Sequence, residues 1–255
     1  MKAIFLDIDG TLIDGEAGPF PEDLQQIEAA HKAGHKIFLS TGRSMASLPL
    51  ALKAVPWLDG MVAGCGATVV LSGQILYRKA VPTELLPKIC QLYLDNRKWC
   101  VFEGETGVFA LGPPLLFDYG EPPVRLHHPE DFQKKYPQEI ITKVTMQGFL
   151  SPQERAVFEP ALRINEFTLY SEGIVAGETK VTGMDRVLAV LGLTRADAIA
   201  VGDSENDLDI IKAAGLGVAM GNACDALKRE AKVITHNVGE GGVAWVFKRY
   251  VLSAS

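Results

Sequence analysis

The feature that most constrains this chain is a series of short apolar runs that each end at a polar residue. Residues 2–6 lead directly into Asp7, and residues 198–201 lead into Gly202 and Asp203. Short apolar runs bounded in this way are typical of strands that are buried on both faces of a parallel sheet. Further runs of this kind occupy residues 36–39, 61–63, 216–219 and 232–234.

Helical patterns lie between these runs. A hairpin is predicted from residues 67–71 and 74–78, on either side of Ser72 and Gly73. Strands that alternate with helices indicate an α/β fold, with a Rossmann-like parallel sheet covered on both faces. The predicted helices span residues 21–34, 44–55, 181–191, 208–214, 225–230 and 243–250.

The middle of the chain follows a different pattern. Pro and Gly are dense between residues 103 and 123, where the regular alternation is lost. We therefore predict an α+β domain, residues 81–177, inserted into a core made of residues 1–80 and 178–255. Within the insert we expect helices at 83–96, 129–135 and 152–164, and strands at 140–146 and 166–170.

Composition narrows the class of partner. The 255 residues carry a net charge of −6 with a pI near 5.4, which argues against nucleic acid or an anionic membrane as a partner. The apolar run near the N-terminus is too short for a signal peptide or a membrane span. Four cysteines show no C-x-x-C pairing, as expected of reduced thiols. The expected location is the cytoplasm.

Carboxylates gather where these strands end. Asp7 and Asp9 are two residues apart, so both can face one site, and Asp203 and Asp207 follow another strand. An ordinary Asp-Gly turn would account for Asp9 and Gly10 but not for Asp7, which follows four apolar residues. Carboxylates held together repel unless a cation neutralises them or one of them stays protonated, and Mg²⁺ prefers oxygen ligands. The sequence therefore predicts a Mg²⁺ site.

Groups that suit a phosphate lie nearby in this arrangement. Thr41 ends the second strand, Gly42 lets backbone N–H groups approach an anion, and Arg43 follows. Taken alone, this segment is also compatible with an ordinary turn. Lys180, at the start of a predicted helix, suits a phosphate as well, but taken alone it is also compatible with a solvent-exposed surface lysine. The segment 202–207, Gly-Asp-Ser-Glu-Asn-Asp, is more specific because it directly follows a buried strand.

These motifs resemble the four signatures of the haloacid dehalogenase (HAD) superfamily of phosphotransferases, in the expected order. The segments 40–43, 218–223 and 241–244, and the length of the insert, are similar to those of the Cof-type phosphatases, which carry a type C2 cap domain. The chain departs from the family pattern at Cys65, where Asn is frequent, and at Val181, where Gly usually follows the motif lysine.

The resemblance implies a mechanism. Asp7 would attack phosphorus and form an aspartyl phosphate, and Asp9 would act as general acid and base. Asp7, the backbone carbonyl of Asp9 and Asp203 would bind Mg²⁺, while Asp207 would steady the metal ligands. The remaining implied groups, which would bind the phosphate or substrate, are Ile8, Gly10, Thr41, Gly42, Arg43, Lys180 and Asn206.

Three other functions are compatible with such a fold. A dehalogenase would need neither a metal nor a second aspartate, and Asp9 argues against it. A sugar phosphomutase would pass the phosphoryl group from Asp7 to another sugar hydroxyl instead of water. A non-enzymatic regulatory protein would have lost a catalytic group, and none is lost here. The expected substrates are sugar phosphates or similar small phosphorylated metabolites, among which the sequence does not choose.

Overall fold

Two compact units make up the chain. The computed structural model describes residues 1–255 except 16–17, 54, 113–121 and 254–255. One unit comprises Met1–Gly42, Pro49–Tyr77 and Thr179–Ser255, and the other comprises Arg43–Leu48 and Arg78–Glu178. The first unit differs from the expected core, 1–80 and 178–255, by a few residues at each boundary and by the segment Arg43–Leu48.

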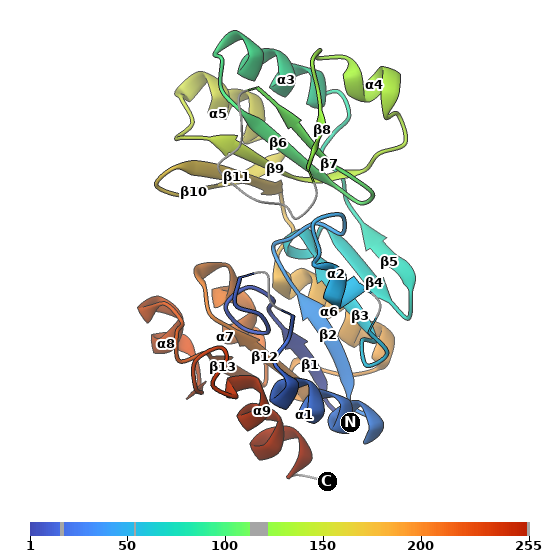
Figure 1. The fold of residues 1–255 in the computed structure, drawn as a ribbon, viewed down its shortest axis with the longest axis vertical. Coiled ribbons are helices and arrows are strands. Elements are labelled where there is room, and N and C mark those ends of the chain that lie inside the picture. Colours follow the sequence, from blue (N-terminus) through green and yellow to red (C-terminus); the bar gives the residue numbers. More distant parts are fainter. Residues whose placement is uncertain (16–17, 54, 113–121, 254–255) are drawn as a thin grey trace. The chain divides into compact units, whose positions relative to one another are not determined.

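The first unit is built on an eight-stranded sheet with the order β14-β13-β12-β1-β2-β3-β4-β5 (Figure 1). Neighbours from β14 to β3 are parallel, and β4 turns back antiparallel to β3. This arrangement confirms the predicted α/β class. The strands are β1 (Ala3–Leu6), β2 (Lys36–Ser40), β3 (Gly60–Ala63), β4 (Thr68–Leu71), β5 (Gln74–Arg78), β12 (Ala198–Gly202), β13 (Leu216–Ala219) and β14 (Val233–Ile234).

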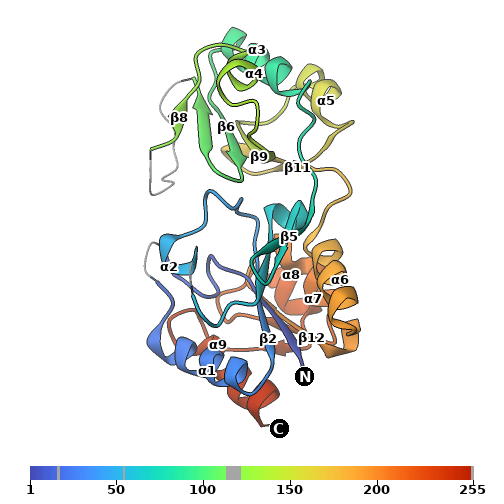
Figure 2. The same cartoon turned by 90° about the vertical axis from the view of Figure 1, so that its right-hand side faces the viewer.

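Helices cover both faces of this sheet (Figure 2). On one side α1 packs against α9, and on the other α6 packs against α7 and α7 against α8. The α-helices are α1 (Pro21–Lys32), α2 (Leu50–Lys53), α6 (Lys180–Leu191), α7 (Leu208–Ala213), α8 (Asp225–Glu230) and α9 (Gly242–Val246). Short 3₁₀ helices are η1 (Gly64–Gly66), η2 (Arg195–Asp197) and η3 (Glu205–Asp207), and the π-helix η4 (Phe247–Leu252) continues α9.

The second unit is an α+β layer with a six-stranded sheet in the order β10-β11-β9-β6-β7-β8. Its helices lie on one face of the sheet, where the rings of Phe102 and Phe132 are 5.0 Å apart between centroids (Figure 1). The elements are α3 (Leu86–Asp95), α4 (Asp131–Lys135), α5 (Pro152–Phe158), β6 (Cys100–Gly104), β7 (Val108–Leu111), β8 (Val124–Arg125), β9 (Ile141–Gln147), β10 (Leu162–Glu166) and β11 (Tyr170–Val175).

Two predicted elements are wrong. The helix expected over 44–55 is reduced to α2, because the Ala46 N–H donates to the Gly104 carbonyl of β6 and Pro49 has no N–H to donate to a helical hydrogen bond. The helix expected over 152–164 ends at Phe158, two residues before Pro160, which cannot donate a helical hydrogen bond.

The strand expected over 166–170 is also displaced. Residues 167–169 form the turn between β10 and β11, and the two strands lie on either side of it. None of the helices in the described part of the chain is both long and apolar enough to cross a membrane.

Candidate active site

Asp7 is the first residue after β1. The strand is buried along its whole length, and the Asp7 N–H donates to the carbonyl of Val201 on β12 at 3.0 Å. The parallel register therefore carries directly into the residue that follows the strand. Only 5% of Asp7 is exposed. A carboxylate so buried needs partners, because water cannot solvate it.

A tight loop after Asp7 sets the next residues. The N–H groups of Leu12 and Ile13 both donate to the carbonyl of Ile8, at 2.9 and 3.0 Å. Gly10 has a φ of 75°, in the left-handed region, and a Cβ at this position would collide with the carboxylate of Asp203. Glycine is required here for both reasons.

Asp203 and Asp207 come from the end of β12. The backbone N–H groups of Asp203 and Ser204 both donate to Oδ2 of Asp207 at 3.2 Å. Gly202 lies so close to Asp207 that a Cβ there would collide with its carboxylate. Asp207 is 1% exposed, and this local turn holds its side chain toward Asp7 and Asp203.

Lys180 joins the two carboxylates. Its Nζ donates to Oδ1 of Asp7 at 2.7 Å and to Oδ1 of Asp207 at 2.5 Å, and its side chain is fully buried. Lys180 is the first residue of α6, whose N-terminus is capped reciprocally by Thr179 and Thr182. This cap fixes where the helix begins, and so fixes the start of the lysine side chain.

Thr41 and Gly42 form a further side of the site. The Thr41 N–H donates to the carbonyl of Val62 on β3, and the Thr41 carbonyl accepts from Cys65 N–H at 3.0 Å. A Cβ on Gly42 would lie 3.5 Å from Nδ2 of Asn206 and 3.6 Å from Sγ of Cys65. Gly42 therefore lies next to the loop that carries Asp203 and Asp207.

The acidic groups of this cluster outnumber its positively charged groups. Burial raises the pKa of Asp7 to about 8, opposed by Lys180 and reinforced by Asp207 and Asp203. Burial and the Asp207 carboxylate likewise raise the pKa of Asp203 to about 6. Burial lowers the pKa of Lys180, but Asp207 and Asp7 outweigh it and raise the pKa, so the lysine stays charged. Three carboxylates face one ammonium.

The residues present fit a divalent cation. Asp7, Asp203 and Asp207 each offer an oxygen, and these oxygens lie within 4.8 Å of one another. Oδ1 of Asp203 is buried and has no hydrogen-bond partner among the described residues. A buried carboxylate oxygen without a partner, beside excess negative charge, is what a hard cation with oxygen ligands would satisfy.

Residues 4–247 match the sequence profile of a family described as haloacid dehalogenase-like hydrolases. The chain belongs to this hydrolase family. The resemblance to its Cof-type members, seen above in the segments 40–43, 218–223 and 241–244 and in the length of the insert, is confirmed.

Several relatives of this hydrolase are named as phosphatases. Two from Bacillus subtilis (strain 168) are named 5-amino-6-(5-phospho-D-ribitylamino)uracil phosphatase. YitU is 42% identical over 97% of this chain and 96% of its own length, and YcsE is 28% identical over 99% and 96%. A sugar phosphatase of HAD subclass IIB has a similar structure, with a TM-score of 0.81, 25% identity and coverage of 98% of this chain and 99% of its own. The chain is thus a phosphoric monoester hydrolase of the HAD superfamily.

The other predicted site residues occupy different positions in this hydrolase. The Asp9 side chain is exposed and is not part of the carboxylate cluster, although its charge acts on Asp203. Asn206 is exposed beside Gly42, and Ile8 is fully buried. Arg43 groups with the second unit.

Two residues of the site were missed as such. Cys65 has a φ of 53°, in the left-handed region that a non-glycine residue seldom adopts, and its sulfur faces Gly42. Asn222 donates from Nδ2 to the carbonyl of Gly10 at 2.8 Å and accepts from Val238 N–H. The resemblance in segment 218–223 had pointed to Asn222 without assigning it a contact.

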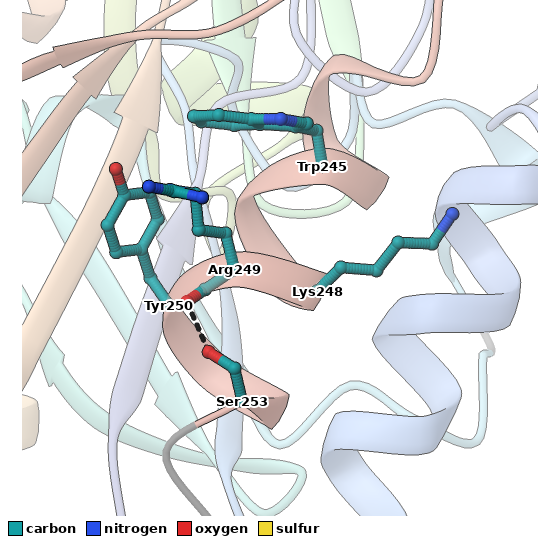
Figure 3. A pocket seen from close by; sticks show the side chains of 5 residues that line it. All are labelled: Trp245, Lys248, Arg249, Tyr250 and Ser253. Atoms are coloured by element: carbon teal, nitrogen blue, oxygen red, sulfur yellow. Dashed lines mark hydrogen bonds between the residues drawn. The ribbon is translucent and has the colours of Figure 1, made fainter.

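A separate pocket of about 480 Å³ lies along α9 and η4 (Figure 3). The Arg249 guanidinium carbon is 5.8 Å from the ring centroids of both Trp245 and Tyr250. Lys248 and Ser253 complete the lining, which contains no carboxylate. Because its lining lacks the carboxylates that a metal site and an aspartate nucleophile need, this pocket is not the candidate active site.

Proposed function

We propose that this hydrolase is a Mg²⁺-dependent phosphatase of small phosphorylated metabolites that passes through an aspartyl phosphate on Asp7. The observation that carries the proposal is the position of Asp7. Its buried carboxylate accepts a hydrogen bond from the ammonium of Lys180 and lies within 4.8 Å of two further carboxylates, at the end of β1 in the parallel part of the sheet. Ligands of open α/β sheets bind at this edge.

In the first step, a carboxylate oxygen of Asp7 attacks phosphorus. A new P–O bond forms to Asp7 while the P–O bond to the leaving alkoxide breaks. Asp9, exposed and two residues away, gives its proton to that alkoxide. The products of this step are the free alcohol and a phosphorylated Asp7.

In the second step, Asp9 takes a proton from water as the water oxygen attacks phosphorus. The P–O bond to Asp7 breaks, inorganic phosphate leaves, and both aspartates return to their starting states. Lys180, the Thr41 hydroxyl, the Gly42 N–H and Asn206 bind the phosphoryl oxygens during both steps. Arg43, Ile8 and Gly10 contribute to binding the phosphate or the substrate. Together these groups must lower the barrier by about 20 kcal/mol, because phosphate monoesters hydrolyse very slowly in water.

Asp7, Asp203 and the backbone carbonyl of Asp9 would hold Mg²⁺, with Asp207 orienting the ligands. The ion would supply positive charge that balances the negative charge of the three carboxylates and of a phosphate dianion. Asp207 is suited to an orienting role because its oxygens already accept from Lys180 and from two backbone N–H groups.

For the substrate we propose phosphate monoesters of sugars or sugar alcohols. The relatives named above act on a phosphoribityl compound, and the similar structure is that of a sugar phosphatase. We further propose that residues 81–177 form the domain that selects the leaving group. A cytoplasmic location is part of the proposal, supported by four cysteines that are all free thiols.

The test is a panel of sugar phosphates, ribityl phosphates and p-nitrophenyl phosphate, assayed with Mg²⁺ or with EDTA. Asp7→Asn should abolish hydrolysis, and EDTA should abolish it in the wild type. Asp14→Asn is the matched control, since Asp14 is exposed and lies in the same loop region. Hydrolysis that persists in Asp7→Asn, or that is indifferent to EDTA, would contradict the proposal.

A further inference from the structure

The side chain of Asn222 connects two loops of the first unit that are far apart in the sequence. Its Nδ2 donates to the carbonyl of Gly10 at 2.8 Å, and its Oδ1 accepts from the Val238 N–H at 2.8 Å. A carbonyl can only accept and an N–H can only donate, so the two partners fix which end of the amide faces which loop. All three residues belong to the same compact unit, which also contains the carboxylate cluster.

The segment that carries Asn222 is itself bonded to the end of β12. Two residues before it, the Met220 N–H donates to the carbonyl of Gly202 at 2.9 Å. Two residues after it, the Cys224 N–H donates to the carbonyl of Asp203 at 2.9 Å. These backbone bonds on both sides fix where the Asn222 side chain begins. Its bond to Gly10 therefore joins the loop after β1 to the loop after β12.

Gly10 is the residue on which this bond acts. Glycine has more backbone freedom than any other residue. The Gly10 N–H donates to the Ile13 carbonyl at 2.9 Å, and the Gly10 carbonyl accepts from Asn222. One bond holds the peptide group before Gly10 and the other holds the peptide group after it, so together they fix its φ and ψ. The peptide group after Gly10 has a further bond, from the Thr11 N–H to the Ile8 carbonyl, but at 3.3 Å it is the longer of the two.

The conformation of Gly10 bears on Asp9, because the Asp9 carbonyl and the Gly10 N–H belong to one rigid peptide group. We propose that Asn222 is a positioning residue that fixes Gly10 and thereby holds Asp9 for proton transfer to the leaving alkoxide. This inference rests on the proposed function, in which Asp9 is the general acid. The Asn222 side chain itself touches neither the phosphate nor the leaving group in this account.

The test compares kcat/KM for the best sugar phosphate of the panel with kcat/KM for p-nitrophenyl phosphate. This ratio constant covers the steps up to release of the alcohol, and only the sugar alkoxide needs a proton in those steps. Asn222→Asp keeps an acceptor for the Val238 N–H but, as a carboxylate, has no donor for the Gly10 carbonyl. It should lower kcat/KM about tenfold for the sugar phosphate, the effect of one lost hydrogen bond, and less than about threefold for p-nitrophenyl phosphate.

Two further variants separate the lost bond from the added charge. Asn222→Ala removes the donor without adding a charge and should produce the same difference between the two substrates. Asn96→Asp is the matched control, since Asn96 is exposed in the second unit and its Nδ2 donates to the Leu92 carbonyl at 2.8 Å. Equal losses for both substrates in Asn222→Asp would overturn the proposal. The same difference between substrates in Asn96→Asp would also overturn it.

Hydrogen exchange measured by NMR separates this inference from the proposed function. Asn222→Asp and Asn222→Ala should both speed exchange of the Gly10 N–H about tenfold, because Gly10 loses one of its restraints. The Val238 N–H should stay protected in Asn222→Asp, which still accepts from it, and lose protection in Asn222→Ala.

Unchanged exchange at Gly10 in both variants would overturn the anchoring by Asn222, whatever the kinetics. A wild type that hydrolyses no phosphate ester would instead overturn the proposed function and with it the role of Asp9, even if the exchange result held.

Discussion

At the end of the eight-stranded sheet burial raises the pKa of Asp7 to about 8 and that of Asp203 to about 6. In the second unit the pKa of Asp131 falls from 3.8 to about 2. Burial alone would raise it, but the His127 and His128 N–H groups and the Lys135 ammonium outweigh burial. Burial therefore governs the pKa of Asp7 and Asp203, whereas hydrogen bonds and a neighbouring ammonium govern that of Asp131.

Asp131 and Glu103 differ from Asp203 in how many partners their carboxylate oxygens have. In the second unit, Asp131 and Glu103 accept hydrogen bonds or face an ammonium on both oxygens. In the first unit, one oxygen of Asp203 has no partner among the described residues. Carboxylates whose oxygens all have hydrogen-bond or ammonium partners stabilise a fold. Carboxylates with too few positively charged partners are suited to binding a cation and, through it, a phosphate.

The largest expected effect comes from removing the lysine of the cluster. Lys180→Met leaves Asp7 and Asp207 without their ammonium, and should lower the free energy of unfolding by about 3–5 kcal/mol in the absence of Mg²⁺. Lys143→Met in the second unit should cost less, about 1–3 kcal/mol, because Ser47 and Thr145 still bond Glu103. Urea-induced unfolding measures both, and equal losses would break the comparison.

A smaller effect is expected from the cation itself. Mg²⁺ at about 100 times its Kd should stabilise the wild type by about 3 kcal/mol, seen as a rise in Tm. Asp203→Asn should lose most of that rise, since it removes a charge from the cluster. Asp225→Asn, at an exposed position, is the control that should keep it. A Tm that does not respond to Mg²⁺ in the wild type would contradict the assignment of the cluster as a metal site.

The smallest effect is expected at Asp131. Its folded pKa, about 2, lies below the ordinary value of 3.8, so its contribution to stability is present above about pH 4 and is lost as the pH falls toward 2. Asp131→Asn should therefore cost about 1–2 kcal/mol at pH 7 and almost nothing near pH 2. Urea titrations at both pH values measure this, and a cost independent of pH would show that the charge is not what stabilises the turn.

The sequence predicted the parallel sheet well because its strands are local patterns. Apolar runs that end at Asp7, Thr41 and Asp203 can be recognised within a few residues, and parallel topology then brings those ends to one edge. The structure places Asp7, Lys180, Asp203 and Asp207 together, while their roles stay predictions.

The second unit was predicted less well because its contacts depend on pairing between distant residues. Nothing near Glu103 in the sequence indicates Ser47, and the register shift that joins them exists only once β6 and β9 are paired. The helix expected over 44–55 was wrong for the same reason, since that segment binds to the sheet instead. The end of α5 was missed for a different reason, because Pro160 in the sequence already indicated that the helix stops before residue 164.

The central claim is that Asp7 becomes phosphorylated, and the most direct test uses Asp9→Asn with p-nitrophenyl phosphate. This leaving group needs no proton, so the first step should proceed, whereas hydrolysis of the intermediate lacks its base. The account predicts a burst of about one p-nitrophenolate per enzyme. After an acid quench, a phosphoryl group should be found on Asp7 by mass spectrometry. No burst, or a phosphoryl group on another residue, would contradict the account.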